Sequence, residues 1–152
     1  MNHVITTRTA VCADQQTLLD LQRRASLNNP GDREALLAHP EVNVLPLHQI
    51  ESSQVFVAEV DGIIKGFAAV VPRPDGNSEL DALFVEPSHW RRGIGRLLLE
   101  YGCSKAKASG AAELHVIGNP HAEGFYTASG FRSLGTIEMR FGVGLLMKRR
   151  LV

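Results

Sequence analysis

The stretch that decides the fold is LDALFVEPSHWRRGIGRLLL, residues 80–99. An apolar segment typical of a strand runs into a proline, and a basic turn with glycines at positions 93 and 95 leads directly into an apolar helix pattern. The glycines let the backbone bend and let a ligand come close to exposed N–H groups. The first turn of the helix leaves N–H groups unpaired and directs the positive end of its dipole toward the strand. The segment therefore predicts a phosphate-binding site.

Basic side chains surround the same turn. Arg91, Arg92 and Arg96 add three planar guanidinium groups, a shape that suits phosphate oxygens. A dinucleotide fingerprint would need a third glycine where Leu98 stands, and the Gly-Lys-Ser/Thr of a P-loop is absent. The turn favours a diphosphate ligand, with a solvated basic helix start as the alternative interpretation.

A second informative stretch is NPHAEGFYTASGF, residues 119–131. Together the two stretches resemble the GNAT acetyltransferase superfamily, whose glycine turn reads Q/R-x-x-G-x-G/A and whose later segment reads N-x-x-A-x-x-F-Y-x-x-x-G-F. The matching residues are Gly93 and Gly95 in the first pattern and Asn119, Ala122, Phe125, Tyr126, Gly130 and Phe131 in the second. Trp90 departs from the family, since it stands where Gln or Arg is found. The resemblance spans residues 55–147.

Hydrophobic periodicity predicts the order of the elements. The sequence VFVAEV, then Asp61-Gly62, then IIKGFAAVV is the signature of an antiparallel hairpin. A strand at 78–85, a helix at 93–109 and a strand at 113–117 form a right-handed crossover, so these two strands are expected to be parallel. The other expected elements are a strand near 4–11, a helix from an N-cap at Asp14, a helix at 32–38, an unassigned stretch at 41–53, a helix at 120–128 and strands at 131–140 and 145–151.

The predicted fold class is therefore α/β. We expect one domain, residues 1–152, with a GNAT-type mixed and largely antiparallel central sheet flanked by helices. The resemblance adds two splayed parallel strands at the cofactor site.

Charge and composition limit the classes of function that the protein is expected to have. Sixteen basic residues balance sixteen acidic ones, so no global charge favours nucleic acid or an anionic membrane surface. The first residues lack the apolar run of a signal peptide, and no stretch approaches the roughly 20 apolar residues of a membrane span. Cys12 and Cys103 lack metal or disulfide spacing, and the six histidines show no i, i+4 ligand pair. We expect a cytoplasmic protein that binds no nucleic acid, no membrane and no metal.

The resemblance implies acetyl-CoA as co-substrate. It assigns backbone pairing with the pantetheine arm to Leu83, Phe84 and Val85, and the diphosphate to the turn formed by Arg91, Arg92, Gly93, Ile94, Gly95 and Arg96. It also places Asn119 and Tyr126 near the cofactor. A helix N-cap explains an Asn before Pro equally well.

Acyl transfer to an amine needs a base and an acid, because the amine must lose a proton and the departing thiolate must gain one. Strand alternation puts Glu79 and Asp81 on one face. An acidic residue recurs in the family at the position of Glu79, which makes it the first choice for the base, directly or through water. Carboxylates that solvate a strand end are the alternative. The family's tyrosine protonates the thiolate, which assigns Tyr126 this role against that of an ordinary aromatic neighbour of Phe125. Backbone N–H near Leu83 is the candidate donor to the oxyanion.

These features and the resemblance predict an N-acetyltransferase, which moves the acetyl group from acetyl-CoA to a primary amine of a small molecule or protein by direct attack. A non-catalytic CoA or acyl-CoA sensor of the same fold is the alternative, with Trp90 as a mark of drift. A nucleotide or sugar-phosphate binder that uses the glycine turn alone is a third. No motif identifies the acceptor amine. A homodimer is compatible with the apolar final segment, residues 142–151, which suits either pairing across a partner or an internal strand.

Overall fold

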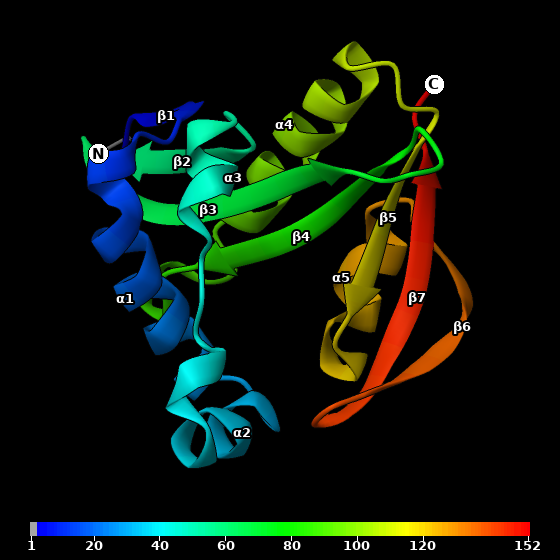
Figure 1. Ribbon diagram of the computed structural model, residues 1–152. Helices are drawn as coiled ribbons and strands as arrows, with labels where there is room; N and C mark the ends of the chain where they lie inside the picture. Colours follow the sequence, from blue (N-terminus) through cyan, green and yellow to red (C-terminus); the bar gives the residue numbers. More distant parts are fainter. Residues whose placement is uncertain (1–2) are drawn as a thin grey trace. The chain divides into compact units, whose positions relative to one another are not determined.

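The computed structural model describes residues 3–152 and divides into two compact units (Figure 1). Unit 1 comprises the residues up to Ala69 together with Ala82–Leu99, and unit 2 comprises Val70–Asp81 and Glu100–Val152. The elements are, in chain order, β1 (Ile5–Thr9), α1 (Gln15–Leu27), α2 (Asp32–Ala38), α3 (Leu47–Glu51), β2 (Val55–Val60), β3 (Ile63–Pro72), β4 (Ser78–Val85), α4 (Ile94–Ala108), β5 (Glu113–Gly118), α5 (Glu123–Ala128), β6 (Arg132–Met139) and β7 (Gly142–Arg150).

Within residues 3–152 the strands form a seven-stranded sheet in the order β1-β2-β3-β4-β5-β7-β6. Strand β1 pairs antiparallel with β2, β2 with β3, β5 with β7 and β6 with β7. Strands β4 and β5 are parallel, and Glu79 lies opposite His115 in their register. The mixed, largely antiparallel α/β sheet and its parallel pair are thus confirmed.

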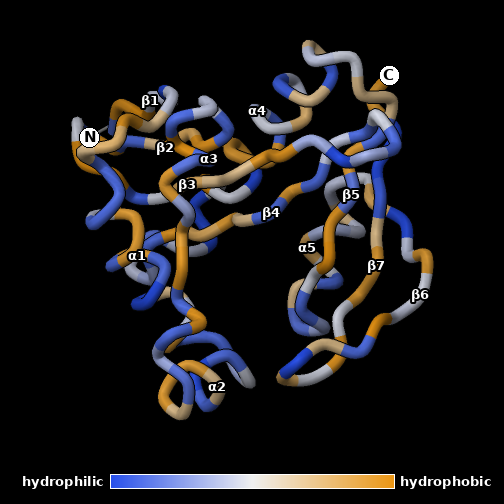
Figure 2. Tube along the Cα trace, in the orientation of Figure 1, coloured by the Kyte–Doolittle hydropathy of each residue, from blue (hydrophilic) through white to orange (hydrophobic). Residues whose placement is uncertain are grey.

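The core of unit 1 lies between α1 and the β2–β3 hairpin. Leu18 and Leu21 of α1 are fully buried, and they cluster with Val55, Val57 and Phe67 of the two strands. Figure 2 shows hydrophobic residues along β2 and β3, as expected for strands that face this cluster. The hairpin and α2 begin and end where the sequence predicts, within one residue.

Two expectations for the N-terminal part need correction. Asp14 does not cap α1 through its side chain. Its carboxylate instead accepts the Val11 N–H at 2.9 Å and pairs with Arg8 at 2.8 Å, because a neighbouring guanidinium competes for it. The unassigned stretch 41–53 contains α3, a short helix that buries Ile50 against the core of unit 1.

In unit 2, strand β7 is internal. It lies between β5 and β6 and pairs with both (Figure 1), so its backbone groups have partners on either side. Of the two interpretations of the final segment, the internal strand is the one observed. Met147 of β7 is buried, as are Leu114 and Val116 of β5 and Phe131, and Met147 lies opposite Val116 in the β5–β7 register. The helices of residues 3–152 include none that is both long and apolar enough to cross a bilayer.

The start of α4 lies very close to β3 in unit 1. A Cβ built on Gly66 of β3 would meet Leu98 Cδ1 at 2.9 Å, Ile94 Cγ2 at 3.1 Å and the Phe84 carbonyl oxygen at 3.1 Å. Glycine at position 66 therefore lets the first two turns of α4 approach the sheet, which fixes the position of the basic turn.

We predict that Gly66→Ala lowers the free energy of unfolding by about 1–3 kcal/mol, because the added methyl group overpacks this contact. Gly124→Ala is the matched control, since a Cβ there meets nothing within 4 Å and its backbone is helical. The control is expected to be neutral or to stabilise by about 0.5–1 kcal/mol. Urea unfolding measures both, and equal stability of the two variants would contradict the close approach.

Candidate functional site

The basic turn of unit 1 has the backbone of an anion site. Gly93 directly precedes α4, and its carbonyl accepts the Leu97 N–H at 3.0 Å as the first helical bond. Its φ of +84° lies in the left-handed region that favours glycine, and a Cβ there would meet nothing within 4 Å. The N–H groups of the first helical turn therefore have no carbonyl of their own helix to bind, and the space beside Gly93 is open.

The three arginines of the turn carry uncompensated charge. Arg91, Arg92 and Arg96 are exposed, and within residues 3–152 they form no ion pair or hydrogen bond through their side chains. Arg91 also has a positive φ of 63°. Three free guanidinium groups beside the positive end of a helix favour a ligand with at least two negative charges.

Trp90 has a structural role that sequence reasoning missed. Its indole Nε1–H donates to the carbonyl oxygen of Val85 at 2.7 Å, which ties the turn to the last residue of β4. One residue further on, Glu86 forms a two-point contact with Arg24 of α1, at 2.9 and 2.7 Å. The Arg24 guanidinium lowers the pKa of Glu86, so this carboxylate stays charged. Two contacts thus hold the end of β4 where the turn begins.

Of the three β4 residues expected to pair with the pantetheine arm, two are already engaged in part. The Val85 carbonyl accepts the bond from the Trp90 indole. The Phe84 ring packs against Phe67 with centroids 5.6 Å apart, on the core of unit 1. Backbone pairing does not use this ring, so the packing is compatible with the assigned role.

Tyr126 lies in unit 2 on α5, and its side chain is almost fully buried. The ring stands edge-on to Phe125 and Phe131, with centroids 5.2 and 5.4 Å away. A Cβ built on Gly118 of β5 would come within 3.1 Å of the ring, so glycine there makes room for it. Tyr126 is thus a member of an aromatic cluster. Burial raises the pKa of its hydroxyl to about 12, which keeps the proton that a general acid needs.

Asn119 is exposed at the end of β5, just before a 3-10 turn at Pro120–Ala122. Its carbonyl accepts the Ala122 N–H at 2.9 Å, but its side chain makes no capping bond to that turn. The N-cap alternative for this side chain is therefore not observed.

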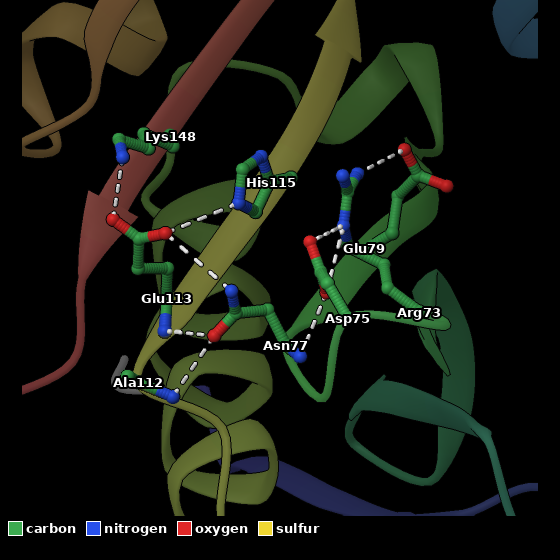
Figure 3. A network of polar contacts seen from close by, with 8 residues as sticks. All are labelled: Arg73, Asp75, Asn77, Glu79, Ala112, Glu113, His115 and Lys148. Carbon is green, nitrogen blue, oxygen red and sulfur yellow. Dashed lines mark hydrogen bonds and ion pairs between the residues drawn. The ribbon is translucent and has the colours of Figure 1, made fainter.

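Glu79 and Asp81 are the two candidate bases. Asp81 is exposed. Glu79 is partly buried on β4, and its Oε1 lies 3.5 Å from the Arg73 guanidinium, which also contacts Asp75 at 3.2 Å. Figure 3 shows the Arg73 side chain between these two carboxylates. One oxygen of Glu79 is therefore engaged by a cation.

The contacts around Glu79 belong to a larger polar network that the sequence did not predict (Figure 3). The Asn77 side-chain oxygen accepts the N–H groups of Ala112 and Glu113, at 3.2 and 3.1 Å. The Glu113 carboxylate lies 2.6 Å from Lys148 Nζ of β7 and 3.4 Å from His115 Nε2. These residues come from three strands and a turn, so no local spacing in the sequence could have revealed the network.

The sequence-predicted site residues divide between the two units. Unit 1 holds Leu83, Phe84, Val85 and the basic turn, whereas unit 2 holds Glu79, Asp81, Asn119 and Tyr126. Among residues 3–152 no group of three or more His, Cys, Asp or Glu side chains has a metal-binding arrangement.

Comparisons with known proteins agree with this fold. The family model described as "Acetyltransferase (GNAT) family" matches residues 18–131. Similar solved structures include PaiA N-acetyltransferase of Thermoplasma acidophilum in complex with coenzyme A, with 20% identity, TM-score 0.79 and coverage of 97% of this chain and 99% of that one. A GCN5-related N-acetyltransferase of Rhodopseudomonas palustris has 21% identity, TM-score 0.78 and coverage of 99% of both chains. YncA of Salmonella typhimurium, solved with its cofactor acetyl-CoA, has 19% identity, TM-score 0.71 and coverage of 97% and 94%. At these identities the likeness shows the fold. A search of curated proteins finds no match.

We predict that Tyr126 ionises near pH 12 in a spectrophotometric titration of tyrosinate, and that Tyr126→Phe lacks this late component. Because burial favours the protonated phenol, the folded protein holds this proton more tightly than the unfolded chain, whose tyrosine titrates near ~10. The free energy of unfolding should therefore fall by about 2–3 kcal/mol more in the wild type than in Tyr126→Phe as the pH rises from about 10 to about 12. Parallel declines in the two proteins would contradict the buried hydroxyl.

Proposed function

Because the chain belongs to the acetyltransferase (GNAT) family, we propose that it transfers the acetyl group of acetyl-CoA to a primary amine of a small molecule or protein. The observation that carries the proposal is the turn before α4, where a left-handed glycine and three unpaired arginines meet the start of a helix. Coenzyme A carries a diphosphate, the dianionic group that such a turn favours. The complexes of PaiA with coenzyme A and of YncA with acetyl-CoA support the choice of cofactor.

In this proposal the cofactor binds through backbone and arginines. The N–H groups of Ile94, Gly95 and Arg96 bind the diphosphate, and the side chains of Arg91, Arg92 and Arg96 neutralise it. The pantetheine arm pairs with the backbone of Leu83 and Phe84 and with the N–H of Val85. Asn119 and Tyr126 lie beside the cofactor.

The reaction is direct attack of the neutral amine on the thioester carbonyl. A base, for which Glu79 and Asp81 are the candidates from the resemblance, takes one proton from the amine, and the nitrogen forms a bond to the carbonyl carbon. The N–H of Leu83 stabilises the oxyanion of the tetrahedral intermediate. The carbon–sulfur bond then breaks, and the thiolate of coenzyme A takes the proton of the Tyr126 hydroxyl, which regains a proton from solvent before the next turnover.

The departure of Trp90 from the family pattern is the sequence feature that favours a non-catalytic CoA sensor. Its indole bond to Val85 gives the tryptophan a structural reason to stand there, so its presence is no argument for lost activity. The presence of the family's tyrosine, Tyr126, supports the enzyme over the sensor, because CoA binding alone needs no acid.

We predict that Gly93→Glu weakens acetyl-CoA binding by about 10–100-fold in calorimetric titration, because it adds negative charge and a side chain to the anion turn. Gly31→Glu is a closely matched control. Gly31 has φ +85°, a Cβ there meets nothing within 4 Å, and it lies between α1 and α2 rather than in the turn. Equal loss of binding in both variants would refute a specific site at Gly93, and absence of binding in the wild type would refute the proposed cofactor.

We predict that Tyr126→Phe lowers turnover by about 10–100-fold at unchanged acetyl-CoA affinity, because it removes the acid that protonates the leaving thiolate. Thiol release over a panel of primary amines measures turnover: free amino acids, peptides with a free N-terminus, polyamines and aminoglycosides. Tyr101→Phe, which alters the other tyrosine of the chain, serves as the control and is expected to keep full activity. Binding of acetyl-CoA by the wild type without turnover of any amine would instead support the sensor.

A further inference from the structure

The most informative unassigned group is the imidazole of His115, in the middle of the polar network of unit 2 (Figure 3). His115 lies opposite Glu79 in the parallel β4–β5 register and opposite Lys148 in the antiparallel β5–β7 register. Side chains at paired positions share one face of a sheet. His115 therefore lies in the same row as Glu79, the carboxylate that the resemblance favours as the base.

The two ring nitrogens of His115 have different surroundings. Nε2 is buried without a hydrogen bond, but it lies 3.4 Å from the Glu113 carboxylate, and the whole side chain is 16% exposed. If Nε2 carries the proton, its N–H faces the Glu113 carboxylate, which is favourable. If Nε2 carries the lone pair instead, that lone pair faces the negative charge of the carboxylate. The proton therefore belongs on Nε2, and Nδ1 keeps the lone pair that can accept another proton.

Glu113 is itself held in place. Lys148 binds its other oxygen at 2.6 Å, and Asn77 contacts both its side chain and its backbone N–H. The Lys148 ammonium lowers the pKa of the Glu113 carboxyl, so Glu113 remains a carboxylate. A fixed carboxylate behind one nitrogen of an imidazole is the arrangement that orients a histidine base and stabilises it once it is protonated.

We propose that His115 is the group that accepts the proton of the acceptor amine, with Glu113 as its positioning residue. This inference rests on the proposed function. As the amine attacks the thioester, its proton moves to Nδ1, directly or through one water, and the imidazolium is stabilised by Glu113. After the product leaves, the imidazolium returns the proton to solvent. As a residue type, imidazole holds a proton more strongly than a carboxylate does, so it is the better base for an amine at neutral pH.

The charged and titratable groups that surround His115 come from every element beside it. They are Glu113 on β5, Lys148 on β7, Glu79 on β4, and Arg73 and Asp75 before β4. Arg73 already engages one oxygen of Glu79 and also contacts Asp75, so the cation nearest the two carboxylates is committed to them. The contact of His115 with Glu113 is made through Nε2, which is the buried ring nitrogen, and not through Nδ1.

The test compares His115→Gln, Glu113→Gln and Glu79→Gln with the wild type, on an amine that the wild type acetylates. For His115→Gln we expect kcat/KM for the amine at pH 7 to fall by about 100-fold or more, with acetyl-CoA affinity unchanged. The acid limb of the pH profile, which in the wild type follows one group, should then be lost. Activity of His115→Gln should recover at high pH, where the free amine is itself abundant. Added imidazole should rescue His115→Gly.

Glu113→Gln should move the acid limb without abolishing it, because a positioning residue acts through the imidazole. His3→Gln is the control, because His3 is an exposed histidine that precedes β1. This variant should keep the wild-type pH profile. Suppose that the wild type is active and that the acid limb survives in His115→Gln but is lost in Glu79→Gln. This result would overturn the role of His115 and leave the proposed function standing. A wild type that turns over no amine would overturn the proposed function and this inference with it. Unchanged acetyl-CoA affinity and urea unfolding establish that the variants are folded, and His115→Asn replaces His115→Gln if the latter is not.

Discussion

The close contact between β3 and the start of α4 is the constraint on which the basic turn depends. Glycine at position 66 removes the one Cβ that would hold the helix away, and Ile94 and Leu98 are buried as a result. Burial of these two side chains fixes the rotation of α4 about its axis, since residues four apart lie on one face. This rotation fixes the directions in which Arg96 and the first N–H groups of α4 point. Trp90 and Glu86 add the second restraint, because they hold the strand end from which the turn departs. A charged ligand thus meets a site whose geometry is already fixed, and little ordering is needed on binding.

A different principle governs the polar face of unit 2. There polar contacts link the side chains: Lys148 with Glu113, Glu113 with His115, and Arg73 with the carboxylates of Asp75 and Glu79. Exposed ion pairs of this kind contribute little to stability. The Glu113 pairs are partly buried and share one carboxylate, so they specify orientation more than they stabilise the fold. That is the property required of groups that must exchange protons at fixed positions.

The sequence predicts those parts of the fold that local signals determine. The Asp61-Gly62 hairpin, α2 before Pro40, and the strand–turn–helix around Gly93 all carry such signals, and all are confirmed. The sequence did not predict the short helix α3, because this helix has no periodic apolar face of its own and forms by burying Ile50. The role of Asp14 was not predicted because the Arg8 side chain of β1 competes for its carboxylate. Candidate-site residues follow the same rule. The glycine turn and Tyr126 lie in contiguous motifs, whereas His115 becomes visible only when pairing of β4 with β5 places it opposite Glu79. Their roles in catalysis stay predictions.

Acid and base chemistry near neutral pH requires two groups whose environments separate their proton affinities. In the proposed reaction Tyr126 is the acid and His115 is the base, and both lie in unit 2. Aromatic burial raises the pKa of the Tyr126 hydroxyl, so this group stays protonated well above neutral pH. His115 has polar surroundings instead, and its buried Nε2 lies 3.4 Å from the Glu113 carboxylate. In this proposal, an apolar cluster therefore surrounds the acid, and an ion-pair network surrounds the base. Since both are built from residues other than the cofactor turn, changes in the turn should alter affinity while leaving the order of proton transfers intact.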